Sequence, residues 1–348
     1  MRICPLSASS PMMRSATTLA LADMCPILMV DIDEGGMSMR LFDGFEETLS
    51  RRVPLAHSCM TCSLREGITP LLEELGESDI PTLLLALPIG AELMSTVPAL
   101  VNLTLPDGPL VGMTVTSAVH ITDADCAARD MFEHVPLVDV GCALFDNDDR
   151  CTGEILMNSV EYADIVCALG CDTVGTELIE RLRPLDTLMV AHLDQLTSEI
   201  LFSAGHDPEA AIERIHPAST QAWGGPSTHG VWTLDLHSDK PFHPHRLARH
   251  AHELAPQGIC ARGCFWVPSR PTMVGTWEVS SGGASIGRAG EWEDGAFTHL
   301  IVTGVGSDED RKEIAEAFGR LLMTDSEMAD ALAWIGAADG LDDWFGED

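Results

Sequence analysis

Hydrophobic residues in the first two-thirds of the chain form short runs typical of buried strands, separated by stretches with helical periodicity. The runs that predict strands are residues 26–32, 82–87, 110–121, 165–169 and 187–191. Strands that alternate with helices in this way predict an α/β domain with a largely parallel sheet.

The periodic pattern ends between residues 205 and 229, where Pro, Gly, Ser and Thr dominate, and we interpret this stretch as a linker. A second block follows, which predicts a small α+β domain with strands near 231–236, 260–268 and 296–303 and helices near 243–254 and 308–322. In the acidic end of the chain, Thr324 and Glu327 have the spacing of a capping box. The predicted organisation is a first domain at 1–204, a linker at 205–229, a second domain at 230–323 and an acidic helix or tail at 324–348.

The charge balance limits the classes of partner. The 348 residues include 20 basic and 54 acidic side chains, a formal net charge of −34. Such a surface repels phosphate backbones and anionic lipids, so we expect neither direct nucleic-acid binding nor membrane binding. A basic partner protein, a bound cation or a merely solvating role all fit this charge.

The lengths of the apolar runs and the spacing of the cysteines indicate the cellular compartment of the protein. No apolar run approaches the length of a membrane span. The eleven cysteines are irregularly spaced, which argues against a disulfide framework and for a reducing, cytoplasmic environment.

The sharpest local motif is a cysteine pair, Cys59 and Cys62, with His57 two residues before it. Ser63 and Glu66 have capping-box spacing, so both thiols are expected at a helix N-terminus, where the helix dipole favours thiolate. Two thiolates at this spacing suit Zn²⁺, with His57 as a third candidate ligand. A redox pair and ordinary buried thiols are the alternatives.

Lysine is almost absent. Lys240 and Lys312 are the only two, and a phosphate-binding loop needs a lysine that reaches the β- and γ-phosphates. Composition therefore excludes a lysine-dependent nucleotide site in the first domain. Histidines gather in the second domain, among them His245, His250 and His252, as a solvated or capping cluster or an opportunistic zinc site.

Several motifs resemble one family. The segment from Ser58 to Glu66 is similar to the Gly-Cys-x-Cys-Cys-[Thr/Ser]-x-Arg motif of the CobW-type metallochaperone GTPases, with Thr61 in place of the middle cysteine. Val160-Glu-Tyr-Ala-Asp164 resembles the segment before that family's guanine-recognition strand. In the second domain, Lys240-Pro-Phe-His-Pro-His-Arg246 and Arg262-Gly-Cys-Phe-Trp266 resemble the CobW C-terminal domain. The resemblance covers nearly the whole chain and implies a P-loop-GTPase-like sheet domain followed by that small domain.

The departures from the family all concern the nucleotide. Residues 6–17 have neither glycine nor lysine where the phosphate loop belongs. Leu169-Gly-Cys-Asp172 stands for Asn-Lys-x-Asp, and Leu87-Pro-Ile-Gly90 stands for Glu-[Ser/Thr]-x-Gly. Only Asp172 and Gly90 remain as candidate GTP-binding residues. We therefore expect a degenerate site without catalytic residues, a pseudo-GTPase that does not hydrolyse GTP·Mg²⁺ unaided.

The same departures resemble one branch, the actinobacterial proteins that recruit a ribosome hibernation factor, which also share the segment from Leu321 to Met328. That resemblance implies a zinc-responsive adaptor, with a hibernation factor and small ribosomal subunit proteins as partners under zinc limitation. A metallochaperone GTPase that allocates zinc to client proteins is the alternative. Trp334, Trp344 and Phe345 within the acidic end suit a docking surface, although a disordered tail has the same composition.

Overall fold

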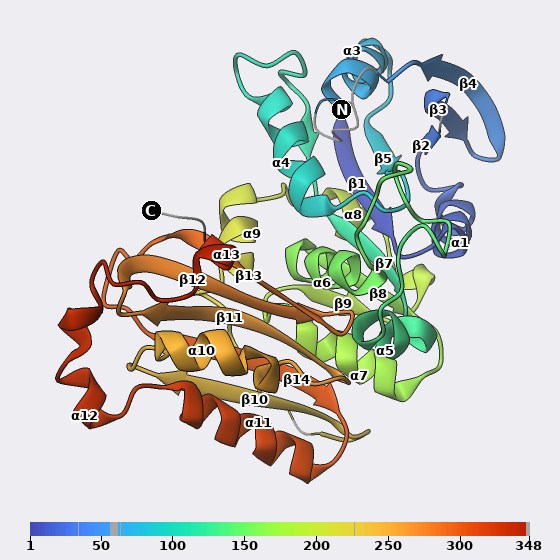
Figure 1. Cartoon of the computed structure of the whole chain (residues 1–348). Helices are drawn as coiled ribbons and strands as arrows, with labels where there is room; N and C mark the ends of the chain where they lie inside the picture. Colours follow the sequence, from blue (N-terminus) through green and yellow to red (C-terminus); the bar gives the residue numbers. More distant parts are fainter. Residues whose placement is uncertain (34, 56–61, 63, 226, 346–348) are drawn as a thin grey trace. The chain divides into compact units, whose positions relative to one another are not determined.

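The computed structural model describes residues 1–33, 35–55, 62, 64–225 and 227–345 (Figure 1). The chain forms two compact units. The first comprises residues 1–127 and 135–214, and the second comprises residues 128–134 and 215 to the end.

The described residues of the first unit form a nine-stranded sheet in the order β4-β3-β2-β5-β1-β7-β8-β9, with β6 paired to β1. From β2 to β9 the neighbouring strands are parallel, while β3 and β4 extend one edge as an antiparallel hairpin. The strands are β1 (Arg2–Ala8), β2 (Ile27–Asp33), β3 (Gly36–Asp43), β4 (Glu46–Val53), β5 (Thr82–Ala86), β6 (Thr114–Val115), β7 (Val119–Asp123), β8 (Ile165–Leu169) and β9 (Leu188–Val190). This largely parallel sheet confirms the predicted α/β class.

Helices connect the parallel strands or follow the last of them. They are α1 (Pro11–Leu21), the π-helical turn η1 (Leu64–Ile68), α3 (Thr69–Gly76), α4 (Leu93–Thr104), α5 (Ala124–Phe132), α6 (Thr152–Tyr162), α7 (Thr173–Leu182), the 3₁₀ turn η2 (Leu193–Gln195), α8 (Ser198–Phe202) and α9 (Pro208–Ile215). Of these, η2, α8 and α9 follow the last of the parallel strands. On one side of the sheet, Leu21 of α1 and Leu201 and Phe202 of α8 pack on Leu6, Leu84 and Val119 in one buried cluster. That packing holds α1 across the middle strands.

Two strand predictions of the first unit were wrong in detail. The strand expected at residues 110–121 is two strands, β6 and β7, and its first residues belong instead to hydrogen-bonded turns that run from Leu105 to Met113. The central strand β1 was not predicted, since its sequence Arg-Ile-Cys-Pro-Leu-Ser-Ala has no run of branched apolar residues. It is nevertheless buried from Ile3 to Ala8, because neighbours pair with it on both edges.

The second unit is an antiparallel sheet in the order β10-β14-β11-β12-β13. Its strands are β10 (Val231–Ser238), β11 (Ile259–Val267), β12 (Arg270–Ser280), β13 (Gly283–Glu291) and β14 (Thr298–Val305). Helices α10 (Pro244–His250), the turn η3 (Ala251–Leu254) and α11 (Asp308–Leu321) lie on one face, where Leu247, Leu254 and Phe318 pack on Phe265 and Trp277 (Figure 1). This is the small α+β domain that the sequence predicted.

The acidic end of the chain is folded as far as the structure describes it. The capping box predicted at Thr324 and Glu327 is present and opens α12 (Asp325–Met328), which is followed by η4 (Ala331–Trp334) and α13 (Asp342–Phe345). Leu341 is buried in the core of the second unit, and Trp344 and Phe345 pack against it. A disordered solvating tail is therefore the wrong description for residues up to 345.

The segment predicted as a linker, 205–229, is only partly irregular. Its first half contains α9, whose Ala211 is fully buried, and residues up to Arg214 belong to the first unit. Among the described residues, no helix is long and apolar enough to cross a membrane.

Candidate functional site

The carboxyl ends of the parallel strands are where an α/β sheet of this kind places its ligand. The loop that leaves the central strand is very short, because only Ser9 and Ser10 separate β1 from α1. Ser10 caps the helix by accepting a hydrogen bond from the Met13 amide at 3.2 Å, and the Ser9 amide donates to the Ile121 carbonyl at 2.9 Å. A loop that wraps phosphates needs several consecutive residues whose amides point at the ligand, and this turn of two residues is too short for that.

Arg14, in the second turn of α1, is the basic residue of this helix. Its guanidinium is buried, donates to the carbonyls of Val30 and Leu87 at 3.0 Å each, and is paired with Asp31. Arg40 holds the other oxygen of Asp31 at 3.0 Å. Arg14 thus ties α1 to the ends of β2 and β5, and its bonds are directed inward to the protein.

Gly90 follows β5, as the sequence placed it, and has a positive φ of 80°. A β-carbon there would meet the Cys142 carbonyl oxygen at 2.2 Å. Glycine is therefore required by the left-handed backbone and by the close approach of the Cys142 loop. Packing alone explains this residue.

Asp172 follows β8 and is the N-cap of α7, where its carboxylate accepts bonds from the amides of Val174 at 3.1 Å and Gly175 at 3.3 Å. Asp125 accepts bonds from the amides of Cys171 and Asp172 at 2.7 Å each, which lowers the pKa of Asp125. Both carboxylates thus stabilise the turn between β8 and α7. The structure brings Asp172 and Gly90 to the same edge of the sheet and gives each a structural role.

Of the three predicted zinc ligands, the structure describes Cys62. His57 and Cys59 lie outside the described residues. Cys62 is half-buried and lies just before the helical segment that begins at Leu64. Among the described residues, no group of three or more His, Cys, Asp or Glu side chains is arranged to hold a metal ion.

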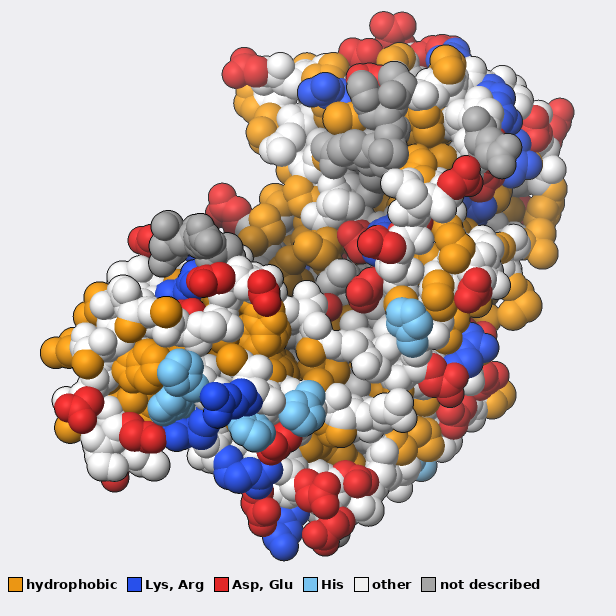
Figure 2. Space-filling view, in the orientation of Figure 1, with side chains coloured by type: hydrophobic (Ala, Val, Ile, Leu, Met, Phe, Trp, Pro, Cys, Tyr) orange, Lys and Arg blue, Asp and Glu red, His pale blue; other side chains and the backbone are white. Residues whose placement is uncertain are grey.

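The histidines of the second unit have protein partners. His243 and His245 lie edge-on to Trp334, with ring centroids 5.2 and 4.9 Å away, and His250 contacts Glu253 at 2.9 Å. Burial, with Arg246 nearby, lowers the pKa of His243. Figure 2 shows Lys, Arg and His side chains gathered over α10 on this face. A solvated cluster, the simpler of the two interpretations, describes them.

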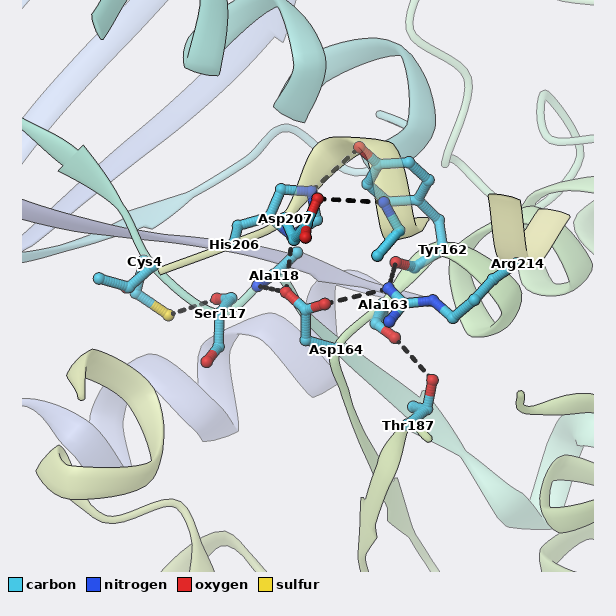
Figure 3. Close-up of polar contacts among 12 residues, drawn as sticks. Cys4, Ser117, Ala118, Tyr162, Ala163, Asp164, Thr187, His206, Asp207 and Arg214 are labelled. Atoms are coloured by element: carbon cyan, nitrogen blue, oxygen red, sulfur yellow. Dashed lines mark hydrogen bonds and ion pairs between the residues drawn. The ribbon is translucent and has the colours of Figure 1, made fainter. Parts of the chain in front are cut away.

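A buried network that sequence reasoning did not predict lies at the opposite, amino ends of β7 and β8 (Figure 3). Asp164 accepts bonds from His206 at 2.7 Å, from Arg214 at 3.0 Å and from the Ala118 amide at 2.8 Å, and the Tyr162 hydroxyl contacts His206 at 3.1 Å. Burial alone would raise the pKa of Asp164, but these donors outweigh it and lower that pKa. Burial raises the pKa of Tyr162.

This network resembles a proton relay in composition only. Tyr162 and the His206 side chain are both 0% exposed, so neither reaches a substrate. Arg214 and His206 instead fasten the segment around α9 to the sheet. The sequence signal was the sole tyrosine of the chain within the Tyr-Ala-Asp motif.

Comparisons with known proteins show what the chain is similar to. The model of the cobalamin synthesis protein CobW C-terminal domain matches residues 231–322. The zinc chaperone Rv0106 of Mycobacterium tuberculosis is 24% identical over 88% of this chain and 83% of its own length. The zinc-regulated GTPase metalloprotein activator 1 of Dictyostelium discoideum is 21% identical over 79% of this chain and 61% of its own.

Among solved structures, the Zn(II)-bound YjiA GTPase of E. coli is 15% identical, with a TM-score of 0.38 over 92% of this chain and 98% of that chain. A TM-score of this size does not by itself establish a common fold. The matched C-terminal domain spans the whole second sheet from β10 to β14 together with α10 and α11. The second unit thus matches the CobW C-terminal domain, and most of the chain is similar to a zinc chaperone.

Proposed function

We propose that this protein is a zinc-responsive CobW-like adaptor that does not hydrolyse GTP on its own. The observation that carries the second half of the proposal is the two-residue turn between β1 and α1, followed by Arg14 bound to Asp31 and two carbonyls. The residues at this edge do not fit a phosphate-binding loop, and the chain has no lysine in the first unit to replace it.

The choice of zinc rests on the chemistry of the candidate ligands and on the names of two relatives. Two thiolates with a neighbouring histidine are suitable zinc ligands, so Cys59, Cys62 and His57 are our candidates. The names of two relatives, a zinc chaperone and a zinc-regulated activator, support the same metal. A carboxylate, another thiol or water would complete four ligands.

For the partner, we propose a hibernation factor together with proteins of the small ribosomal subunit, engaged under zinc limitation. A net charge of −34 opposes contact with ribosomal RNA and favours basic proteins. The place of action would then be the cytoplasm. Since zinc binding and partner recruitment are separate steps, each needs its own test.

The recruitment test uses the tagged full chain, purified from zinc-starved and zinc-replete cells of its own source, with bound proteins identified by mass spectrometry. We expect small-subunit proteins and a hibernation factor to be enriched in one zinc condition. The Cys59→Ser, Cys62→Ser double variant should lose that dependence on zinc. Equal recovery of ribosomal proteins in both conditions would contradict the adaptor function.

A zinc-allocating GTPase is the second candidate, favoured by the word GTPase in the name of one relative and by the retained Asp172 and Gly90. In the same experiment, enrichment of a zinc metalloenzyme without ribosomal proteins would favour it. Tight GTP·Mg²⁺ binding and turnover that disappears in Asp172→Ala would also be required.

A further inference from the structure

An apolar groove of about 200 Å³ opens on the first unit between α1 and the hairpin of β2 and β3. Leu19 and Ala22 of α1 form one wall, Met29 and Phe42 form the floor, and Phe45 in the turn before β4 forms the other wall. None of these residues belongs to the nucleotide-like edge or to the cysteine motif.

The groove exists because the sheet is wider than the helix that covers it. Helix α1 packs mainly over β1 and β7, and the sheet continues past β5 and β2 into β3 and β4. Phe42, paired in register with Ile27, lies where that cover ends and is only half-buried. Gly44 has a φ of 61°, which any residue with a side chain rarely adopts, and this turn places Phe45 at the surface.

Both walls expose large apolar side chains. Leu19 is 65% exposed and Phe45 is 67% exposed, although each borders an apolar hollow. Single exposed apolar residues are ordinary on protein surfaces, but an exposed pair across a groove marks a site for a partner's side chain.

The border of the groove is acidic. Asp23 follows Ala22, and Glu47 is paired in register with Phe42 and lies on the same face of the hairpin. Asp43 and Glu46 are paired with each other beside them and point to the other face. All four are exposed, and within the part of the chain that the structure describes none has an ion-pair partner. One cation, Arg40, lies 5.8 Å from the centre of the Phe42 ring and is paired with Asp31.

We propose that this groove binds a basic amphipathic segment of a partner protein. One bulky apolar side chain of the segment enters between Leu19 and Phe45, and its Lys and Arg residues lie over Asp23 and Glu47. A second copy of this chain is disfavoured as the occupant, because two surfaces with a net charge of −34 repel each other. The site does not depend on the proposed zinc function.

The probe is a fluorescent designed helix with lysines on one face and a single tryptophan on the other. Its binding to the full chain is measured by anisotropy, beside a tryptophan-to-alanine version and a lysine-to-glutamate version. We expect Leu19→Ser and Phe45→Ser each to weaken binding by about tenfold, the effect of losing one anchor contact. The matched control is Leu185→Ser, since Leu185 is 53% exposed elsewhere on the same unit.

A photo-cross-linking experiment locates the bound probe on the chain. With the tryptophan replaced by a photoreactive benzophenone residue, cross-links are expected within residues 18–29 and 42–47. Equal binding by all three variants, or cross-links spread over other acidic surfaces, would show general charge attraction and overturn the proposal. A dimer in sedimentation that both groove variants abolish would also overturn it, because a second copy would then be the occupant.

The zinc proposal and the groove proposal fail independently. The Cys59→Ser, Cys62→Ser double variant should bind the probe as the unmodified chain does. Loss of probe binding in that variant, with the fold intact, would contradict a groove that works without the cysteine motif.

Discussion

The guanidinium of Arg14 on α1 is paired with the carboxylate of Asp31 near the end of β2, and both lie at the edge of the sheet where the family is expected to hold phosphate. Because the same guanidinium also donates to Val30 and Leu87, the charge that lies nearest to the missing loop is directed into the fold. The basic side chain of α1 is thus used in a structural ion pair.

Arg14→Ala should lower the free energy of unfolding by about 3 kcal/mol, because it removes a buried guanidinium that donates to Asp31 and to the carbonyls of Val30 and Leu87, and leaves Asp31 paired with Arg40. Chemical denaturation of the purified protein measures this. The control is Arg52→Ala, which removes an exposed pair with Asp33 and should cost at most about 1 kcal/mol. A loss for Arg14→Ala no larger than for the control would contradict a structural role.

Asp172→Ala should cost about 0.5 to 2 kcal/mol of stability, since it removes the side-chain cap of α7. Asp172→Asn should retain most of that stability, because asparagine caps helices as well as aspartate does. Thermal unfolding of the two variants tests the role as a cap. If Asp172 instead recognised guanine, both substitutions would alter nucleotide binding and leave stability nearly unchanged.

His120 gives the fold a dependence on pH. Its ring is buried on β7, contacts the Ser7 hydroxyl at 2.9 Å through Nδ1, and its Nε2 has no partner within the described residues. Burial lowers the pKa of His120 to about 3, against an ordinary value near 6.5. Between these two values the unfolded chain binds a proton that the folded chain does not.

The contribution of His120 is therefore fully present above pH ~6.5 and is lost as the pH falls toward ~3, at about 1.4 kcal/mol per pH unit. The measurement is the free energy of unfolding against pH for the unmodified chain and for His120→Asn. The slope between pH ~6 and ~4 should be smaller in the variant. Parallel curves would show that His120 is already protonated in the fold.

The C-terminal segment should stabilise the second unit through Arg270, which pairs with buried Asp339 at 3.0 Å and with Asp342 at 2.6 Å. Arg270→Ala is expected to lower stability by about 3 to 5 kcal/mol and to release Trp344 from the core, which tryptophan fluorescence detects. Arg288→Ala, which breaks an exposed pair with Glu291, is the matched control. An unchanged emission spectrum in Arg270→Ala would contradict this role.

Hydrophobic runs located most parallel strands, because strands buried on both faces carry continuous apolar sequence. In the second domain they located β10, β11 and β14, but β12 and β13 were not predicted. The hairpin of β3 and β4 was missed, since β4 is an exposed edge strand rich in Glu and Arg. Its turn signal, Asp43-Gly44, was present in the sequence.

The features of the candidate site that follow from composition could be predicted from the sequence, whereas those that depend on the folded geometry could not. The lack of lysine was readable from the sequence, whereas the pairing of Arg14 with Asp31 depends on β2 lying two strands from β1. Asp172 and Gly90 were assigned to a nucleotide by resemblance, and only the folded turn shows that a cap and a close backbone contact account for them.

The most direct test of the account is a zinc competition titration against a chromophoric chelator, on the unmodified chain and on the Cys59→Ser, Cys62→Ser double variant, with and without GTP·Mg²⁺. We predict a tight zinc site that the double variant loses and that GTP·Mg²⁺ does not change. Zinc affinity that survives in the double variant, or that shifts when GTP·Mg²⁺ is added, would contradict a zinc-responsive protein whose nucleotide site is lost.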